Sequence, residues 1–383
     1  MTTTAVIAAG GYSCSGTGRG PGIELLGLSI DEATGGPAVE RLAVVDLPDP
    51  SFVLWSEDGT LLHAVLEGDP TRVVAVQVSA DGRGAEVIGD LVVDGTGGCH
   101  LSRGTDPSTL IIAQYGAGTV ATVRLDDAGA PIEQIDLDDH RDLRDSGDNS
   151  VESDLGSPHP HQVVALPGTQ LLAVPDLGLD RVLLYRQDVA GMIDLAGEIP
   201  LSRGSGPRHL VADHESEQLH ISCERSGMVA TASRSESAPQ RPLPAAMEGP
   251  THRWSVRSMI PASGREGADA LSHIELTEDE SLLLVANRGP DTLSLLSLAP
   301  MRPLLVTEVE VGAHPRHFTQ WGDLVLVAAQ EGDRIDVLRR HGEELTAAGE
   351  PIPAPSVACL AVRPGEPAER PGGAFLCSCR DDG

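Results

Sequence analysis

The sequence predicts an all-β fold built from one repeated unit. Apolar runs of four to six residues, rich in Val, Leu and Ile, are separated by Gly, Asp and Pro, which is the pattern of strands and turns. The start of the unit recurs at Ser51, Cys99, His161, Arg208, Ser272 and Arg316. The shorter steps give a period of about 45 residues, the size of one four-stranded propeller blade. No amphipathic helix of ten or more residues is expected.

Within each unit, short apolar runs predict the strands that follow the first. Second strands are expected at 61–66, 110–113, 171–174, 282–286 and 324–328, and third strands at 72–78, 119–125, 181–185, 292–298 and 334–338. Two steps between units are longer and contain polar, turn-rich insertions, at 136–157 and 233–267. We expect both insertions to be loops.

The two ends of the chain complete the ring. Residues 5–9 and 23–30 resemble the middle and outer strands of a unit, whereas 356–362 resembles an innermost strand. Joining them adds a seventh blade and removes the free sheet edges of an open array. The prediction is a seven-bladed β-propeller, closed by N- and C-terminal strands in one blade and forming a single domain over 1–383. Residues 363–383 are expected to be a tail, or to add a strand at 374–379.

Charge excludes several classes of function. The chain has 57 acidic against 27 basic residues, a net charge of −30, and no lysine. Nucleic acids and anionic membranes need a basic surface, so neither is an expected partner. Catalysis by a Schiff-base lysine and a phosphate-binding P-loop lysine are excluded as well.

Targeting and cysteine signals are weak. The first residues lack a basic region, and no apolar run reaches the ~18 residues that a membrane span needs, so we expect a cytoplasmic protein. The six cysteines are scattered without zinc-site spacing and are expected to be reduced thiols.

Two sets of residues recur at equivalent places and should meet at the central channel. Five of the 13 histidines stand at the start of a first strand: His100, His161, His209, His273 and His317. The second strands end at Glu67, Tyr115, Leu177, Glu224, Arg288 and Gln330. The histidines could instead make hydrogen bonds between blades. Arg208, Glu224 and Arg288 indicate an anion-binding site with a built-in acid or base.

Three further segments bear on metal, nucleotide and cation binding. His159 and His161 could form a metal pair, but no carboxylates accompany them, so no metal and no cofactor are predicted. The glycine-rich segment 16–20 has no following helix and is expected to be a turn. The acidic segment 136–154 is expected to be a solvated loop.

Several phrases resemble those of the bacterial 6-phosphogluconolactonase family of seven-bladed propellers, which includes carboxymuconate-lactonizing enzymes. These phrases are Ser157-Pro-His-Pro-His161, Gly204-Ser-Gly-Pro-Arg-His209, Ala286-Asn-Arg-Gly289, Pro315-Arg-His-Phe318, Cys99-His-Leu101 and Gln114-Tyr-Gly-Ala-Gly118. The resemblance spans about 5–362. It implies a metal-free site whose catalytic residues fall on His161, Arg208, Glu224 and Arg288. Substrate contacts are expected from His159, His100, Tyr115, His209, His273 and His317.

One phrase departs from the family pattern. Where the family commonly reads Ala-Glu-Ile-His, this chain reads Ser272-His-Ile-Glu275, so Glu275 takes the place of the usual histidine.

The resemblance implies hydrolysis of a sugar-acid lactone, with 6-phosphogluconolactone as the expected substrate and the pentose phosphate pathway as the setting. Arg208 and Arg288 would hold the phosphate or stabilise the oxyanion, and Glu224 and His161 would share the acid and base roles. Two alternatives stay open: a cycloisomerase that closes a muconate onto its alkene, and a propeller that binds without turnover. The expected partner is a small anionic lactone. The oligomeric state is not predicted.

Overall fold

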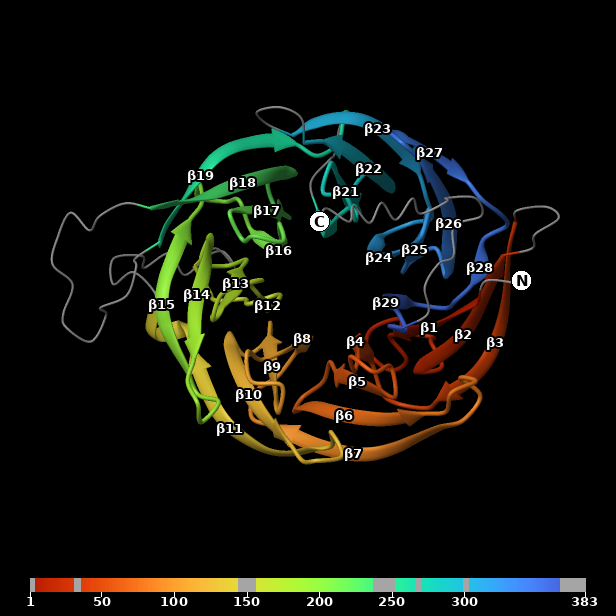
Figure 1. The fold of residues 1–383 in the computed structure, drawn as a ribbon, viewed down its shortest axis with the longest axis horizontal. Coiled ribbons are helices and arrows are strands. Elements are labelled where there is room, and N and C mark those ends of the chain that lie inside the picture. Colours follow the sequence, from red (N-terminus) through yellow and green to blue (C-terminus); the bar gives the residue numbers. More distant parts are fainter. Residues whose placement is uncertain are drawn as a thin grey trace, which may run out of the picture.

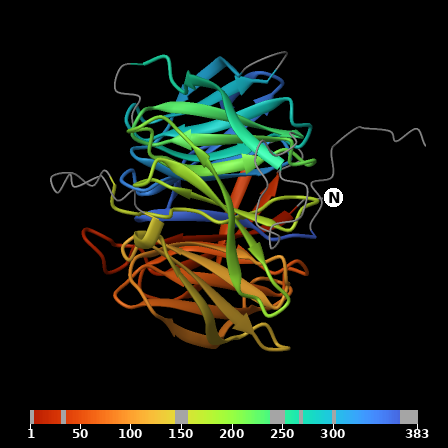
Figure 2. The ribbon, with the colours of Figure 1, turned by 90° about the vertical axis from the view of Figure 1, so that its left-hand side faces the viewer.

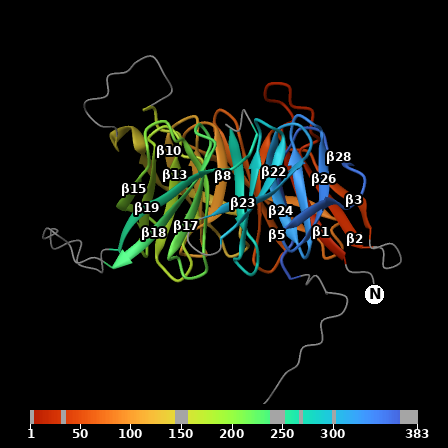
Figure 3. The same ribbon diagram turned by 90° about the horizontal axis from the view of Figure 1, so that it is seen from above.

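Seven sheets surround a central channel in the computed structural model (Figure 1). The structure describes residues 4–30, 36–143, 156–236, 252–265, 270–298 and 303–365. Side views show that the sheets together form a disc (Figures 2 and 3). This confirms the predicted seven-bladed propeller.

The first four blades follow the chain from its N-terminus. Blade 1 contains β1 (Thr4–Gly11), β2 (Ile23–Ile30), β3 (Pro37–Val45) and the C-terminal β29 (Val357–Val362). Blade 2 contains β4 (Pro50–Trp55), β5 (Leu61–Leu66), β6 (Thr71–Val78) and β7 (Ala85–Val93). Blade 3 contains β8 (Gly98–Arg103), β9 (Thr109–Gln114), β10 (Thr119–Leu125) and β11 (Pro131–Asp139). The short 3₁₀ helix η1 (His140–Leu143) precedes blade 4, which contains β12 (Val164–Ala165), β13 (Leu171–Asp176), β14 (Arg181–Gln187) and β15 (Ile193–Pro200).

The other three blades complete the circle. Blade 5 contains β16 (Pro207–Ala212), β17 (Gln218–Cys223), β18 (Met228–Glu236) and β19 (His252–Pro261). Blade 6 contains β20 (Leu271–Leu276), β21 (Leu282–Asn287), β22 (Thr292–Ser297) and β23 (Leu304–Glu310). Blade 7 contains β24 (Pro315–Trp321), β25 (Leu324–Ala329), β26 (Arg334–His341), β27 (Glu344–Ala347) and β28 (Ile352–Pro353), the last pairing with β26.

The two ends of the chain close the ring within blade 1. β29 pairs antiparallel with β1, and Ala8 lies opposite Ala361. In Figure 1 the blue β29 accordingly lies beside the red β1 at the inner end of the blade. The closing strand predicted from 356–362 is therefore confirmed, and it leaves the innermost strand of blade 1 paired.

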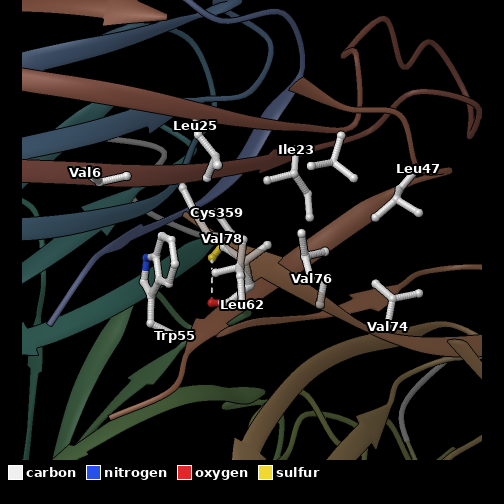
Figure 4. Close-up of a cluster of buried hydrophobic side chains, with 14 of the residues drawn as sticks. Val6, Ile23, Leu25, Leu47, Trp55, Leu62, Val74, Val76, Val78 and Cys359 are labelled. Carbon is white, nitrogen blue, oxygen red and sulfur yellow. Dashed lines mark hydrogen bonds between the residues drawn. The ribbon is translucent and has the colours of Figure 1, made fainter. Parts of the chain in front are cut away.

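The hydrophobic core lies between neighbouring blades, because each sheet buries both faces against the next. Between blades 1 and 2, Leu25, Leu62 and Val74 are fully buried, and the Trp55 indole lies at one side of the cluster (Figure 4). Large exposed apolar side chains lie mostly on or beside the outermost strands, such as Val92 on β7 and Leu304 on β23. The alternation on those strands gives one buried and one exposed face.

Turns between the second and third strands lock one blade to the next. Asp180, Asp291 and Asp333 end such turns with φ of 53°, 54° and 52°. Each carboxylate then accepts backbone N–H bonds from the segment that enters the next blade, as Asp291 does from His314 at 2.7 Å. Asp tolerates this left-handed conformation better than most residues, because its short side chain bonds to nearby backbone. These contacts fix where each first strand begins.

Both insertions predicted as loops contain regular structure, so that prediction is wrong in part. β11 and η1 occupy 136–143, and β18 and β19 extend through 233–236 and 252–261. The β19 sequence alternates polar and apolar residues, as a half-exposed outer strand does, and its arginines and serines hide that signal. The remainder of the acidic segment, at 144–154, and the strand expected at 374–379 lie outside the described residues.

The described cysteines, Cys14, Cys99, Cys223 and Cys359, form no disulfide. Within the described part of the chain, no helix is long and apolar enough to cross a bilayer.

Candidate active site

Seven equivalent residues surround the mouth of the channel and are called here the rim ring. Each follows the second strand of its blade and donates its backbone N–H to a carbonyl just before a first strand, as Glu224 does to Gly206 at 2.7 Å. The members are Tyr12, Glu67, Tyr115, Leu177, Glu224, Arg288 and Gln330. Six were predicted from the repeat. Tyr12 was missed because blade 1 draws its strands from both chain ends, which breaks the linear repeat.

A second layer comes from a β-bulge at the start of the first strands. The register shifts between Pro207 and His209 and between Pro315 and His317, so that Arg208 and Arg316 are the extra residues. Such a residue has no partner across the ladder, which frees its side chain for other contacts. The bulge ring, as we name it, contains Ser51, Cys99, His161, Arg208, Ser272, Arg316 and Ala358.

His161 belongs to this bulge ring, which corrects the predicted equivalence of the five histidines. Pro160 bridges Asp176, as Pro207 pairs with Cys223, so His161 corresponds to Arg208. The residue equivalent to the other histidines is Gln162.

Hydrogen bonds to the following blade confirm this register. Gln162 Oε1 accepts the Leu210 N–H at 2.6 Å, and His100 Nδ1 accepts the Val163 N–H at 3.4 Å in the same way.

Beneath the bulge ring, the remaining histidines form a layer that we call the histidine belt. It contains Phe52, His100, Gln162, His209, His273, His317 and Cys359. Ring centroids of His273 and His317 lie 3.8 Å apart, and His209 Nδ1 lies 2.9 Å from His273 Nδ1. Burial, followed by the charges of neighbouring side chains, lowers the pKa of these histidines, that of His273 to about 3. The belt is therefore neutral at physiological pH.

Three of the predicted site residues meet at the mouth. Arg288 Nη2 lies 2.5 Å and Arg208 Nε 3.0 Å from the same oxygen, Glu224 Oε2. Arg208 is almost fully buried, and its Nη1 has no hydrogen-bond partner among the described residues. Burial, reinforced by Arg288 and Arg316, lowers the pKa of Arg208 to about 9. Such a charged, unpaired donor is costly unless an anionic oxygen accepts from it.

A third arginine joins this cluster although the sequence analysis did not select it. Arg316 lies 5.2 Å from the centre of the Tyr12 ring, and its Nη2 lies 3.9 Å from Glu67 Oε2. Tyr12 donates its hydroxyl to the same Glu67 oxygen at 2.7 Å. Burial opposes the charge of Arg316, but Tyr12 and Glu67 raise its pKa above the ordinary value. The available signal was the phrase Pro315-Arg-His, which repeats Pro207-Arg-His.

His161 borders the arginine cluster from blade 4. Its imidazole is buried, and burial followed by Arg208 and Arg316 brings its pKa well below the usual value. Its Nδ1 lies 3.8 Å from the Cys99 thiol. His161 is therefore an unprotonated imidazole beside three guanidinium groups.

The other predicted contacts lie at two levels. His159 stacks on Tyr115 with centroids 4.3 Å apart and bonds the Tyr115 carbonyl through Nδ1, so both stand at the mouth. His100, His209, His273 and His317 lie in the belt instead. Glu275, which stands where the family commonly has a histidine, adds a carboxylate next to the belt, because its Oε1 lies 3.0 Å from His273 Nε2. Burial raises the pKa of Glu275 to about 7. Among the described residues, no group of three His, Cys, Asp or Glu side chains could hold a metal ion.

The structure is a seven-bladed propeller with two arginines and a carboxylate at the channel mouth. Such a site can bind a ligand through a negatively charged or strongly polarised oxygen atom. The family described as "Lactonase, 7-bladed beta-propeller" matches residues 6–362, and the chain belongs to it. The match covers every blade.

Individual relatives are distant. A Bacillus subtilis protein named 6-phosphogluconolactonase is 22% identical over 253 residues, 66% of this chain and 67% of its own. An uncharacterized Staphylococcus saprophyticus protein is 24% identical over 341 residues, 87% of this chain and 90% of its own. The solved periplasmic gluconolactonase of Pseudomonas aeruginosa shares 23% identity with a TM-score of 0.81, covering 95% of this chain and 100% of that one. At this identity the solved structure supports the fold.

Proposed function

We propose that this lactonase-family propeller hydrolyses the ring ester of a six-carbon sugar-acid lactone at the Arg208–Glu224–Arg288 cluster. The observation that carries the proposal is the joint placement of a carboxylate between two guanidinium groups, one of which keeps an unpaired N–H. 6-Phosphogluconolactone and gluconolactone, which give their names to the Bacillus and Pseudomonas proteins, both belong to this substrate class. A cytoplasmic role in the pentose phosphate pathway stays a prediction.

In the proposed mechanism, water attacks the lactone carbonyl carbon and the C=O π electrons move onto oxygen. Arg208 and Arg288 donate hydrogen bonds to this oxyanion as its charge develops. Glu224 accepts the proton of the attacking water. The C–O bond to the ring oxygen then breaks, and Glu224 returns the proton to the leaving alkoxide. One water is consumed, and the product is the open hydroxy acid.

Glu224 carries both proton transfers in this scheme because His161 is unprotonated. An imidazole with a pKa well below its usual value is a poor proton donor at neutral pH. His161 instead accepts a hydrogen bond from a substrate hydroxyl or from water. Its role is to orient the lactone over the arginines.

The test follows the loss of gluconolactone and of its 6-phosphate at neutral pH, corrected for spontaneous opening. Arg208→Ala and Glu224→Gln should each lower kcat/KM by about 10²-fold or more, since each removes transition-state stabilisation or proton transfer. Glu217→Gln, an exposed change on blade 5, is the matched control and should keep full activity. Full activity in both site variants contradicts the assignment. Ring closure of a muconate by the wild type would favour the cycloisomerase alternative.

A further inference from the structure

A cavity of about 560 Å³ opens beside the proposed catalytic cluster on the same mouth of the channel. It lies between the loop that joins β1 to β2 and the turn that joins β25 to β26, and we call it the rim pocket. Its lining includes three consecutive members of the rim ring: Gln330, Tyr12 and Glu67. Arg288 is the ring member next to Gln330. The pocket therefore adjoins the part of the mouth that holds the proposed catalytic cluster.

Arg316 links the rim pocket to the arginine cluster. Its guanidinium faces the Tyr12 ring and approaches Glu67, which both line the pocket. The same charge also lowers the pKa of Arg208 and of Arg288 after the effect of burial, so it lies close to the catalytic groups. A ligand held by the arginines therefore reaches the pocket without crossing a blade.

The pocket presents acceptors rather than cations. Glu67 and Glu331 contribute carboxylates, whereas the Asp333 carboxylate already accepts the Ser356 N–H and pairs with Arg19, the one basic residue of the lining. Gln330 Oε1 is buried and has no hydrogen-bond partner within the described part of the chain. Buried acceptors of this kind are matched by ligand hydroxyl groups, which donate. A phosphate ester offers mainly acceptor oxygens and about two negative charges, so it is disfavoured there.

We infer that the rim pocket binds the hydroxylated carbon chain of the lactone and selects an unphosphorylated sugar lactone over its 6-phosphate. This inference rests on the proposed function and narrows its substrate class. Gln330 and Glu67 accept hydrogen bonds from the chain hydroxyls, while the arginines hold the ester carbonyl. Glu331, on the solvent side of the pocket, repels a terminal phosphate.

The first experiment compares kcat/KM of the wild-type protein for glucono-1,5-lactone and for its 6-phosphate at low ionic strength. The unphosphorylated lactone should be favoured roughly tenfold or more, and added salt should shrink the ratio because it screens the repulsion. Equal or better use of the 6-phosphate overturns the inference while leaving lactone hydrolysis intact.

The second experiment changes the pocket. Glu331→Gln should raise the relative kcat/KM of the 6-phosphate roughly three- to fivefold, because one repelling carboxylate is lost. Glu86→Gln, on the outer strand of blade 2, is the matched control and should leave the ratio unchanged. An unchanged ratio in Glu331→Gln contradicts the pocket's role in selection.

Binding of the hydrolysis products, gluconate and 6-phosphogluconate, tests the pocket's selectivity even if the protein hydrolyses neither lactone. By calorimetry, gluconate should bind more tightly than 6-phosphogluconate, and Gln330→Leu should weaken gluconate binding. If neither lactone is hydrolysed but gluconate binds in this way, the proposed hydrolase function is contradicted and the inferred binding subsite is supported. Absence of gluconate binding, or tighter 6-phosphogluconate binding, overturns the subsite.

Discussion

The bulge ring and the histidine belt are adjacent positions of the same seven first strands, yet they differ sharply in chemistry. The belt is mostly histidine and carries no arginine: it has four histidines, one phenylalanine, one glutamine and one cysteine, all close-packed or bonded between blades. The bulge ring is not uniform, and its two arginines and His161 depart from the short side chains at the other positions. Short polar members such as Ser272 bond the next blade, at 2.5 Å to the Pro315 carbonyl. Positions whose side chains pack or bond between blades therefore build the channel wall, whereas Arg208, Arg316 and His161 supply polar and charged groups at the mouth.

After the Arg208 and Glu224 variants, the largest predicted effect concerns Arg316, the third guanidinium of the mouth. Arg316→Ala should lower kcat/KM roughly 10- to 100-fold, mainly through KM, because it removes a guanidinium charge beside the proposed lactone site that does not contact Glu224. Steady-state kinetics on gluconolactone measure this. A change confined to protein stability, with kinetics intact, would place Arg316 among the structural residues instead.

Substitutions in the histidine belt should lower the stability of the protein rather than its activity. His317→Ala removes the acceptor of the Leu360 N–H and leaves a cavity, which should cost about 2–4 kcal/mol of unfolding free energy. His317→Gln should cost about 1 kcal/mol or less, since Gln162 makes the equivalent bond in blade 4. Urea unfolding measures both. Equal losses in the two variants would argue against a hydrogen-bonding role.

A smaller effect is expected from pH. The belt histidines have pKa values below 6.5 in the folded protein, so the unfolded chain binds more protons as pH falls below that value. Their contribution to stability is present above pH 6.5 and is lost as the pH falls.

Glu275 acts in the opposite direction. Its raised pKa of about 7 favours folding below about pH 4.5, and this contribution is lost as the pH rises through 7. Because several histidines oppose one glutamate, the urea midpoint should decrease from pH 7.5 to 5.5. Glu275→Gln should steepen that decrease, and a midpoint independent of pH in both proteins would contradict neutral belt histidines.

Much of this architecture was predictable because it repeats. The number of blades, their closure by the chain ends and the meeting of Arg208, Glu224 and Arg288 at the mouth all follow from comparing units. His161 was assigned to the wrong ring because a bulge adds one residue that leaves no mark in composition, and because Gln162 replaces the histidine of the belt. Tyr12 and Glu67 meet only when blades 1 and 2 pack together, which a linear repeat does not reveal. The outer strand β19 was missed because its exposed face is polar.

The most direct test of the division between mouth and belt measures kcat/KM and the urea midpoint of Glu224→Gln and His317→Gln side by side. Glu224→Gln should lose about 10²-fold or more in kcat/KM with little change in midpoint, while His317→Gln should keep its activity within about threefold. The opposite pattern, an active Glu224→Gln and an inactive but folded His317→Gln, would place the chemistry in the belt and contradict the account.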